Sequence, residues 1–142
     1  MKKSASAVWT GGLKDGQGAI STQTGVLRDA PYGFKSRFED GPGTNPEELA
    51  GAAHAGCFTM ALSLMLGEEK LVADRIETRA EVSLEKVGEG FEITTVDLTV
   101  EAVVPGTDQA NFERIATKAK ENCPISKLFK GAKISLKATL KS

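Results

Sequence analysis

The sequence is poor in the residues that metal sites, disulfide frameworks and nucleic-acid interfaces require. It has two cysteines and one histidine in 142 residues, too few for a disulfide-stapled miniprotein or for a four-ligand structural zinc site. Lys and Arg total 18 against 19 Asp and Glu, so the basic surplus that supplies affinity for phosphates is missing. The composition therefore argues against a disulfide framework, a structural zinc site and a dedicated nucleic-acid partner.

Apolar runs long enough for targeting or membrane insertion are also scarce. Two lysines follow Met1, but no apolar stretch comes after them, which predicts the absence of a secretion signal. The one long uncharged run, residues 49–66, is near the lower length limit for a membrane span. It contains His54 and Thr59 and has no Lys/Arg asymmetry on its flanks. We therefore expect the buried helix of a cytoplasmic protein rather than a membrane span.

The distribution of turns and apolar residues predicts a single α+β domain over residues 1–142. Gly-rich alternation in the first forty residues indicates two or three short antiparallel strands. A hairpin, two further helices and a last strand should follow a long helix. The hairpin is expected over residues 76–84 and 91–104, with a β-bulge near Thr94-Thr95. The two helices are expected over 108–122 and 124–130, and the last strand over 134–140.

The long helix is the most clearly marked element. Asn45 can cap it, Pro46 suits the first helical position, and Gly67 is expected to stop it after Leu66. Its residues are apolar on every side, so it must be covered on every side. A chain of this length can hardly do that alone, which predicts a homodimer.

Two cysteines are the first candidates for chemistry. Cys57 lies in the middle of the apolar helix among small residues, where it is either a packing residue or an approachable thiol. Cys123 precedes Pro124 and so is the expected cap of a short helix, a position that favours a thiolate; the alternative is a residue that only joins two helices. If the two meet, one can attack an oxidant and the other can resolve the sulfenic acid as a disulfide.

Charged residues nearby offer three further candidates. His54, three residues before Cys57, suits a Cys–His hydrolase or, more simply, a packed histidine. Arg37 could stabilise a buried thiolate, and Glu47 or Glu48 could hold its guanidinium bidentately. Glu48 is interpreted as a charge that complements the helix dipole.

Taken together, these segments resemble a known family. The runs NPEEL, AAHAGCF and NCPIS at their separations, with VWTGGLKDGQGAISTQTGVL before them, are similar to the OsmC/Ohr family of thiol-dependent hydroperoxide reductases, and closest to its osmotically inducible protein C branch. The similarity covers essentially the whole chain. It implies an OsmC-like fold in which antiparallel sheets surround a long buried helix, in an intertwined dimer.

The resemblance also implies an activity and a role for four residues. Cys57 matches the peroxidatic cysteine, Cys123 the resolving cysteine, Arg37 the arginine that favours the thiolate, and Glu47 the glutamate that holds it. The expected reaction reduces organic hydroperoxides to alcohols in stress defence, through a Cys57 sulfenic acid and a Cys57–Cys123 disulfide, without a cofactor. A dithiol reductant, of lipoyl type in this family, restores both thiols. Four residues are expected to favour an alkyl chain: Phe58, Met60, Leu62 and Phe129.

Two other interpretations stay open at this stage. In one, the chain is a non-catalytic, small-ligand-binding dimer associated with stress, and both cysteines only pack. In the other, it is an acyl hydrolase that uses His54, although no Gly-rich oxyanion turn adjoins Cys57. The first interpretation predicts that both thiols react slowly and at equal rates. The second predicts an activity that does not depend on Cys123.

Overall fold

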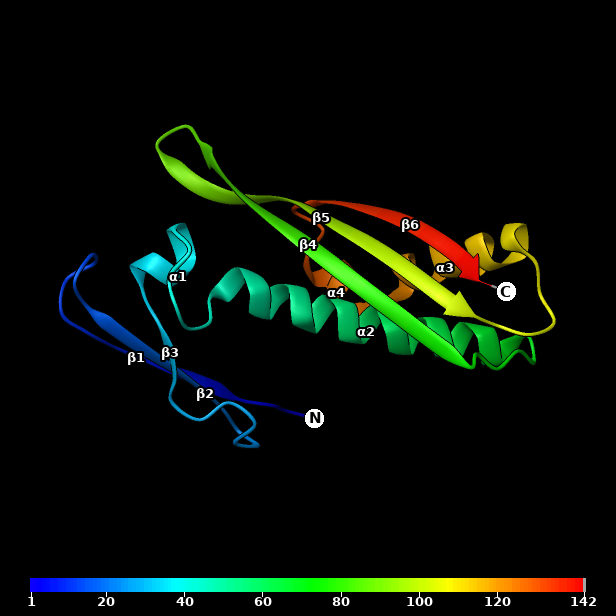
Figure 1. The fold of residues 1–142 in the computed structure, drawn as a ribbon, viewed down its shortest axis with the longest axis horizontal. Helices are drawn as coiled ribbons and strands as arrows, with labels where there is room; N and C mark the ends of the chain where they lie inside the picture. Colours follow the sequence, from blue (N-terminus) through cyan, green and yellow to red (C-terminus); the bar gives the residue numbers. More distant parts are fainter. Residues whose placement is uncertain (142) are drawn as a thin grey trace. The chain divides into compact units, whose positions relative to one another are not determined.

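The computed structural model describes residues 1–141 and confirms the α+β class (Figure 1). Contacts divide the chain into two compact units, residues 1–49 and the remainder from Ala50 onward. The elements in chain order are β1 (Ala5–Thr10), β2 (Gln17–Thr22), β3 (Ala30–Tyr32), α1 (Phe34–Phe38), α2 (Pro46–Glu68), β4 (Arg75–Val87), β5 (Gly90–Val103), α3 (Gln109–Asn122), α4 (Pro124–Leu128) and β6 (Lys133–Lys141).

The N-terminal unit is built on a small antiparallel sheet of order β1-β2-β3. The rings of Trp9 and Tyr32 meet across it with centroids 5.6 Å apart. Gly18 lies between them, and a Cβ there would stand 2.4 Å from the Tyr32 ring, so only glycine fits. The short helix α1 follows, at a place where the sequence predicted the end of the strands. Its first turn is fixed by Ser36, whose hydroxyl accepts from the Gly33 backbone N–H at 2.9 Å.

Helix α2 begins as predicted and ends later. The Asn45 side chain accepts from the Glu48 backbone N–H at 2.7 Å, which confirms the cap. The expected stop at Gly67 was wrong, because Gly67 lies inside the last helical turn. The chain instead leaves the helix through Lys70, which has a φ of 60°, and the Leu71 N–H closes the end on the Leu66 carbonyl.

The second sheet has the order β4-β5-β6. β4 and β5 form the predicted antiparallel hairpin, and the pairing shifts between Ser83 and Leu84 so that Thr94 is extra, which confirms the bulge. The expectation of purely antiparallel sheets was wrong for the last strand, because β6 pairs with β5 in parallel. The reason is the crossover through α3 and α4, which returns the chain to the end of the sheet where β5 starts.

The hydrophobic core lies between this sheet and the helices of the second unit (Figure 1). Along β5, Val96, Leu98 and Val100 are buried, whereas Asp97 and Thr99 between them are exposed, so one face of the sheet is covered. α2 contributes Phe58, Leu62 and Leu66 to that core, and α3 contributes Phe112, Ile115, Ala116 and Ala119.

α2 is covered on one side only within a single chain. Its exposed stripe contains small residues and two large apolar ones, Met60 at 77% and Leu64 at 62% exposure. The helix is also long and apolar enough to pass a length-and-hydropathy test for a membrane span, a test that core helices of soluble proteins pass as well. One stripe of this apolar helix is therefore exposed in the single chain, as expected for a chain of this length, which can hardly cover the helix alone.

Candidate functional site

The two cysteines meet at the junction of three helices in the second unit. Cys57 is half-buried on α2, and Cys123 is fully buried where α3 ends and α4 begins. Cys123 is the N-cap residue of α4, as predicted. The Cys57 thiol lies next to the Cys123 side chain and to the backbone of Ile125, and both act on its pKa. Both thiols are free, so this is a reduced pair whose members lie 66 positions apart in sequence.

The surroundings of Cys57 act on its ionisation in opposite directions. Burial raises the pKa of the Cys57 thiol, and the neighbouring Cys123 raises it further. The Ile125 backbone lowers it, because an N–H in the first turn of a helix stabilises a thiolate. Pro124 has no N–H to offer, so Ile125 supplies the first free donor of α4. The second unit thus makes Cys57 approachable but does not by itself make it acidic.

His54 has a bonding partner that the sequence did not reveal. It is fully buried one turn before Cys57, and its Nε2 lies 2.8 Å from the Ser126 hydroxyl of α4. The Phe129 ring packs edge-on against the imidazole, with centroids 5.5 Å apart. Burial lowers the pKa of His54, so the neutral imidazole is favoured. The spacing from Cys57 was visible in the sequence, but nothing in it pointed to Ser126.

Arg37 and Glu47 form the second predicted pair, and this pair lies in the N-terminal unit. Arg37 Nε donates to Glu47 Oε1 at 3.0 Å, and Nη2 lies 3.0 Å from the same oxygen. The guanidinium also lies over the Phe38 ring at 5.4 Å. The contact is not the two-oxygen fork that was expected, because Glu47 Oε2 is buried and has no partner among residues 1–141. The ion pair therefore fixes Arg37 while one carboxylate oxygen is left to accept another donor.

Glu48 takes no part in that ion pair. Its carboxylate is exposed and accepts from the Thr44 hydroxyl at 2.7 Å, which agrees with a charge at the start of a helix. Among residues 1–141, no group of three or more His, Cys, Asp or Glu side chains is arranged to hold a metal ion.

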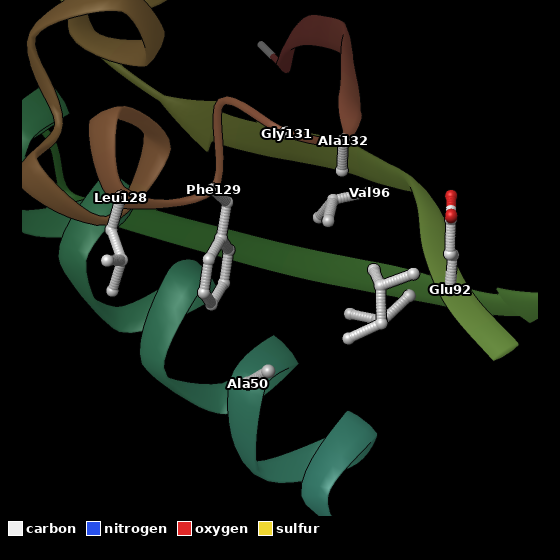
Figure 2. Close-up of a pocket in the computed structure, with 9 residues that line it drawn as sticks. Ala50, Glu92, Val96, Leu128, Phe129, Gly131 and Ala132 are labelled. Atoms are coloured by element: carbon white, nitrogen blue, oxygen red, sulfur yellow. The ribbon is translucent and has the colours of Figure 1, made fainter. Parts of the chain in front are cut away.

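An apolar groove of about 360 Å³ opens on the second unit (Figure 2). Phe129 extends into it toward α2, where Ala50 lies, and Glu92 stands at its edge. Of the four residues expected to favour an alkyl chain, Phe129 lines this groove. Phe58 and Leu62 belong to the core and Met60 lies on the exposed stripe, so these three do not line this groove.

Comparison with known proteins gives consistent matches. The family model described as OsmC-like protein matches residues 39–137. The chain is 54% identical over 140 residues to peroxiredoxin OsmC of Escherichia coli, covering 99% of this chain and 97% of that protein. It is 30% identical over 125 residues to organic hydroperoxide resistance protein OhrB of Bacillus subtilis, covering 87% and 89%.

Solved structures agree with the fold. The crystal structure of OhrB of Bacillus subtilis matches with a TM-score of 0.69 at 29% identity, covering 97% of this chain and 98% of that one. An OsmC-like protein from Mycoplasma pneumoniae matches with a TM-score of 0.78 at 15% identity, covering 100% and 99%. The second likeness bears on the fold alone.

Proposed function

Because the chain belongs to the OsmC family, we propose that it is a cysteine-based peroxidase that reduces organic hydroperoxides to alcohols in stress defence. The observation that carries the proposal is the contact between Cys57 and Cys123, which are far apart in sequence and meet as free thiols. Cys57 is the more accessible of the two, so it is the one that meets the oxidant. Relatives named peroxiredoxin and organic hydroperoxide resistance protein support this chemistry.

The first step is an attack by the Cys57 thiolate on a peroxide oxygen. The O–O bond breaks, the sulfur is oxidised to a sulfenic acid, and the other oxygen leaves as an alcohol after taking up one proton. In the second step the sulfur of Cys123 attacks the sulfenic sulfur, a disulfide forms, and the hydroxyl leaves as water. An external dithiol, which we take to be of lipoyl type, then reduces the disulfide and restores both thiols.

Arg37 is the proposed source of the charge that activates Cys57. The second unit raises the pKa of this thiol by burial, so an efficient peroxidase needs a cation at the sulfur to favour the thiolate. Arg37 is suited to that role because Glu47 fixes its guanidinium. Glu47 accordingly acts as a positioning residue, and Arg37 both stabilises the thiolate and binds the peroxide oxygen that gains charge.

We assign the apolar groove to the organic part of the hydroperoxide. Its wall includes Phe129, which also packs on His54 one turn from Cys57. Apolar surface removed from water contributes about 25 cal/mol per Å² to the binding free energy. The alkyl chain of an organic hydroperoxide therefore strengthens binding in this groove, whereas hydrogen peroxide has no such chain. This arrangement supports a preference for organic hydroperoxides.

The exposed stripe of α2 supports the proposed homodimer. Met60 and Leu64 are large apolar residues that stand in water in a single chain, and Gly56 beside them permits close approach of another helix. Exposed apolar patches of this kind mark interfaces. We propose that the full chain acts as one OsmC-like domain, that a second copy covers this stripe, and that the dimer works in the cytoplasm.

A non-catalytic, ligand-binding dimer is the competing function, and one observation favours it. Burial raises the pKa of Cys57, as it does for cysteines that only pack. That function predicts slow reaction of both thiols and no disulfide after exposure to peroxide.

The deciding experiment counts thiols and measures intact mass after one equivalent of an organic hydroperoxide, with hydrogen peroxide in parallel. We expect the wild type to lose both thiols rapidly, Cys123→Ser to stop at a trapped sulfenate, and Cys57→Ser to be inert. Thr117→Ser, at an exposed position of α3, serves as the matched control and should behave as wild type. If Cys57→Ser consumes peroxide as fast as wild type, the peroxidase assignment fails.

A further inference from the structure

His54 is a buried titratable residue for which the peroxidase mechanism has no use. It is 0% exposed, and its Nε2 is bonded to Ser126, which is itself only 7% exposed. Its Nδ1 is buried and has no partner among the described residues. Burying a polar ring in a core costs free energy unless hydrogen bonds replace those it made with water. The contact it makes is a link from α2 to α4.

That link repeats the spacing of the cysteine pair. His54 lies three residues before Cys57 on α2, and Ser126 lies three residues after Cys123 at the start of α4. Residues three apart lie on the same face of a helix, one turn from each other. The pair of Cys57 with Cys123 and the pair of His54 with Ser126 therefore lie about one helical turn apart, and both join α2 to the start of α4.

α4 is short, so a single side-chain link bears strongly on its position. It has five residues, and its ends are closed by bonds from the Lys127 and Phe129 N–H groups to the carbonyls of Cys123 and Ile125. Ile125 also packs against the core. Leu128 points out of the core at 69% exposure. Of the side chains that fix α4 against α2, Ser126 contributes the hydrogen bond and Phe129, just after it, the ring contact with His54.

We propose that His54 and Ser126 are positioning residues that hold α4 in the register from which Cys123 reaches Cys57, and that they thereby set the rate of disulfide formation. The inference rests on the proposed peroxidase function. It concerns the second step alone, in which the Cys123 sulfur bonds to the Cys57 sulfenic sulfur and water leaves.

The geometry of a disulfide explains why register matters. The two Cβ atoms must come within about 3.5–4.5 Å of each other, whereas one residue of slip along a helix moves a side chain by about 1.5 Å and turns it by about 100°. A link one turn away removes that freedom before oxidation occurs. Neither His54 nor Ser126 needs to touch the sulfur or the peroxide, so the first step is expected to be independent of both.

The test separates the two steps by rapid mixing with one equivalent of an organic hydroperoxide. Quenching with a sulfenate trap and measuring intact mass gives the rate of Cys57 oxidation and the rate of disulfide formation. For Ser126→Ala we expect disulfide formation to slow by about 3- to 10-fold, the worth of one hydrogen bond, with oxidation unchanged. Ser126→Thr keeps the hydroxyl and should resolve at a rate close to wild type.

A second pair of variants keeps the test decisive if Ser126→Ala unfolds. His54→Gln carries an amide nitrogen at the position of Nε2 and should resolve nearly as fast as wild type, whereas His54→Asn cannot reach Ser126 and should be slow. Equal disulfide rates in the fast and slow member of each pair, with Cys57 oxidised normally, would overturn the inference and leave the peroxidase intact. Failure of wild-type Cys57 to be oxidised at all would overturn both.

Discussion

The two units of this chain differ in what they bury. From Ala50 onward, β5, α2 and α3 enclose an apolar core. Across residues 1–49, all of them described, the buried residues are Ser36 and Glu47, both polar. Three short strands with no buried apolar residue do not fold independently. The second unit therefore supplies its own stability, whereas the first, which holds the Arg37–Glu47 pair, depends on a covering surface.

We expect the largest effect from a substitution that prevents a second copy of the chain from covering the first unit. Leu64→Glu places a charge on the exposed stripe of α2 and should yield a monomer by sedimentation. In that monomer we expect amide exchange in β1–β3 to be faster than in β5 by about three orders of magnitude or more, because the core unit retains several kcal/mol of stability. Thr117→Glu adds the same charge on exposed α3 and should leave the dimer unchanged. Equal protection of both sheets in the monomer would refute the comparison.

A substitution that opens a cavity in the core tests whether the second unit supplies its own stability. Phe112 is fully buried on α3, so Phe112→Ala should lower the free energy of unfolding by about 3–5 kcal/mol. Val72→Ala, at a residue 79% exposed in the same unit, should change it by less than about 0.5 kcal/mol. Urea unfolding of the two variants side by side measures both values, and a small loss for Phe112→Ala would mean that the stability lies elsewhere.

Removing the positive charge of Arg37 tests whether the first unit activates Cys57. Removing the guanidinium in Arg37→Met should slow oxidation of Cys57 near neutral pH by about 100-fold, because the thiol is then left with the pKa that burial raises. Glu47→Gln keeps Arg37 charged but loosens it, so a smaller loss of about 3- to 10-fold is expected. Stopped-flow rates with an organic hydroperoxide give both numbers. A larger loss for Glu47→Gln than for Arg37→Met would reverse the assigned roles.

The smallest effect concerns pH and the histidine of the second unit. Burial lowers the pKa of folded His54 below its ordinary value of 6.5, so folded His54 stays neutral where the unfolded chain binds a proton. Its contribution to stability is full above pH 6.5 and is lost as the pH falls through the folded pKa. We expect the wild type to lose more stability between pH 7 and pH 5 than His54→Gln does, by urea unfolding at each pH. Identical losses would show that His54 does not titrate differently on folding.

Local rules predicted the parts of the fold that local chemistry decides. Asn45 capped α2, Cys123 capped α4, and the jump in alternation after Thr95 marked the bulge. The pairing of β6 with β5 was missed because it depends on where the crossover returns the chain. The end of α2 was missed because Lys70, not a glycine, takes the left-handed conformation.

The candidate site shows the same division. Cys57 and Cys123 were identified from their neighbours, and their contact depends on the tertiary arrangement of α2 with α4. The His54–Ser126 bond joins residues 72 apart, a pairing that no local pattern reports. Phe58 and Leu62 were expected to favour an alkyl chain because they are apolar, and the structure places both in the core, where most large apolar residues lie.

The pKa of the Cys57 thiol decides whether a charge from the N-terminal unit activates a sulfur that the second unit alone makes less acidic. The rate of alkylation of Cys57 against pH, in a Cys123→Ser background with and without Arg37→Met, gives the two pKa values. We expect a clearly lower pKa of Cys57 when Arg37 is present. The same pKa in both proteins would show that Arg37 does not activate this sulfur.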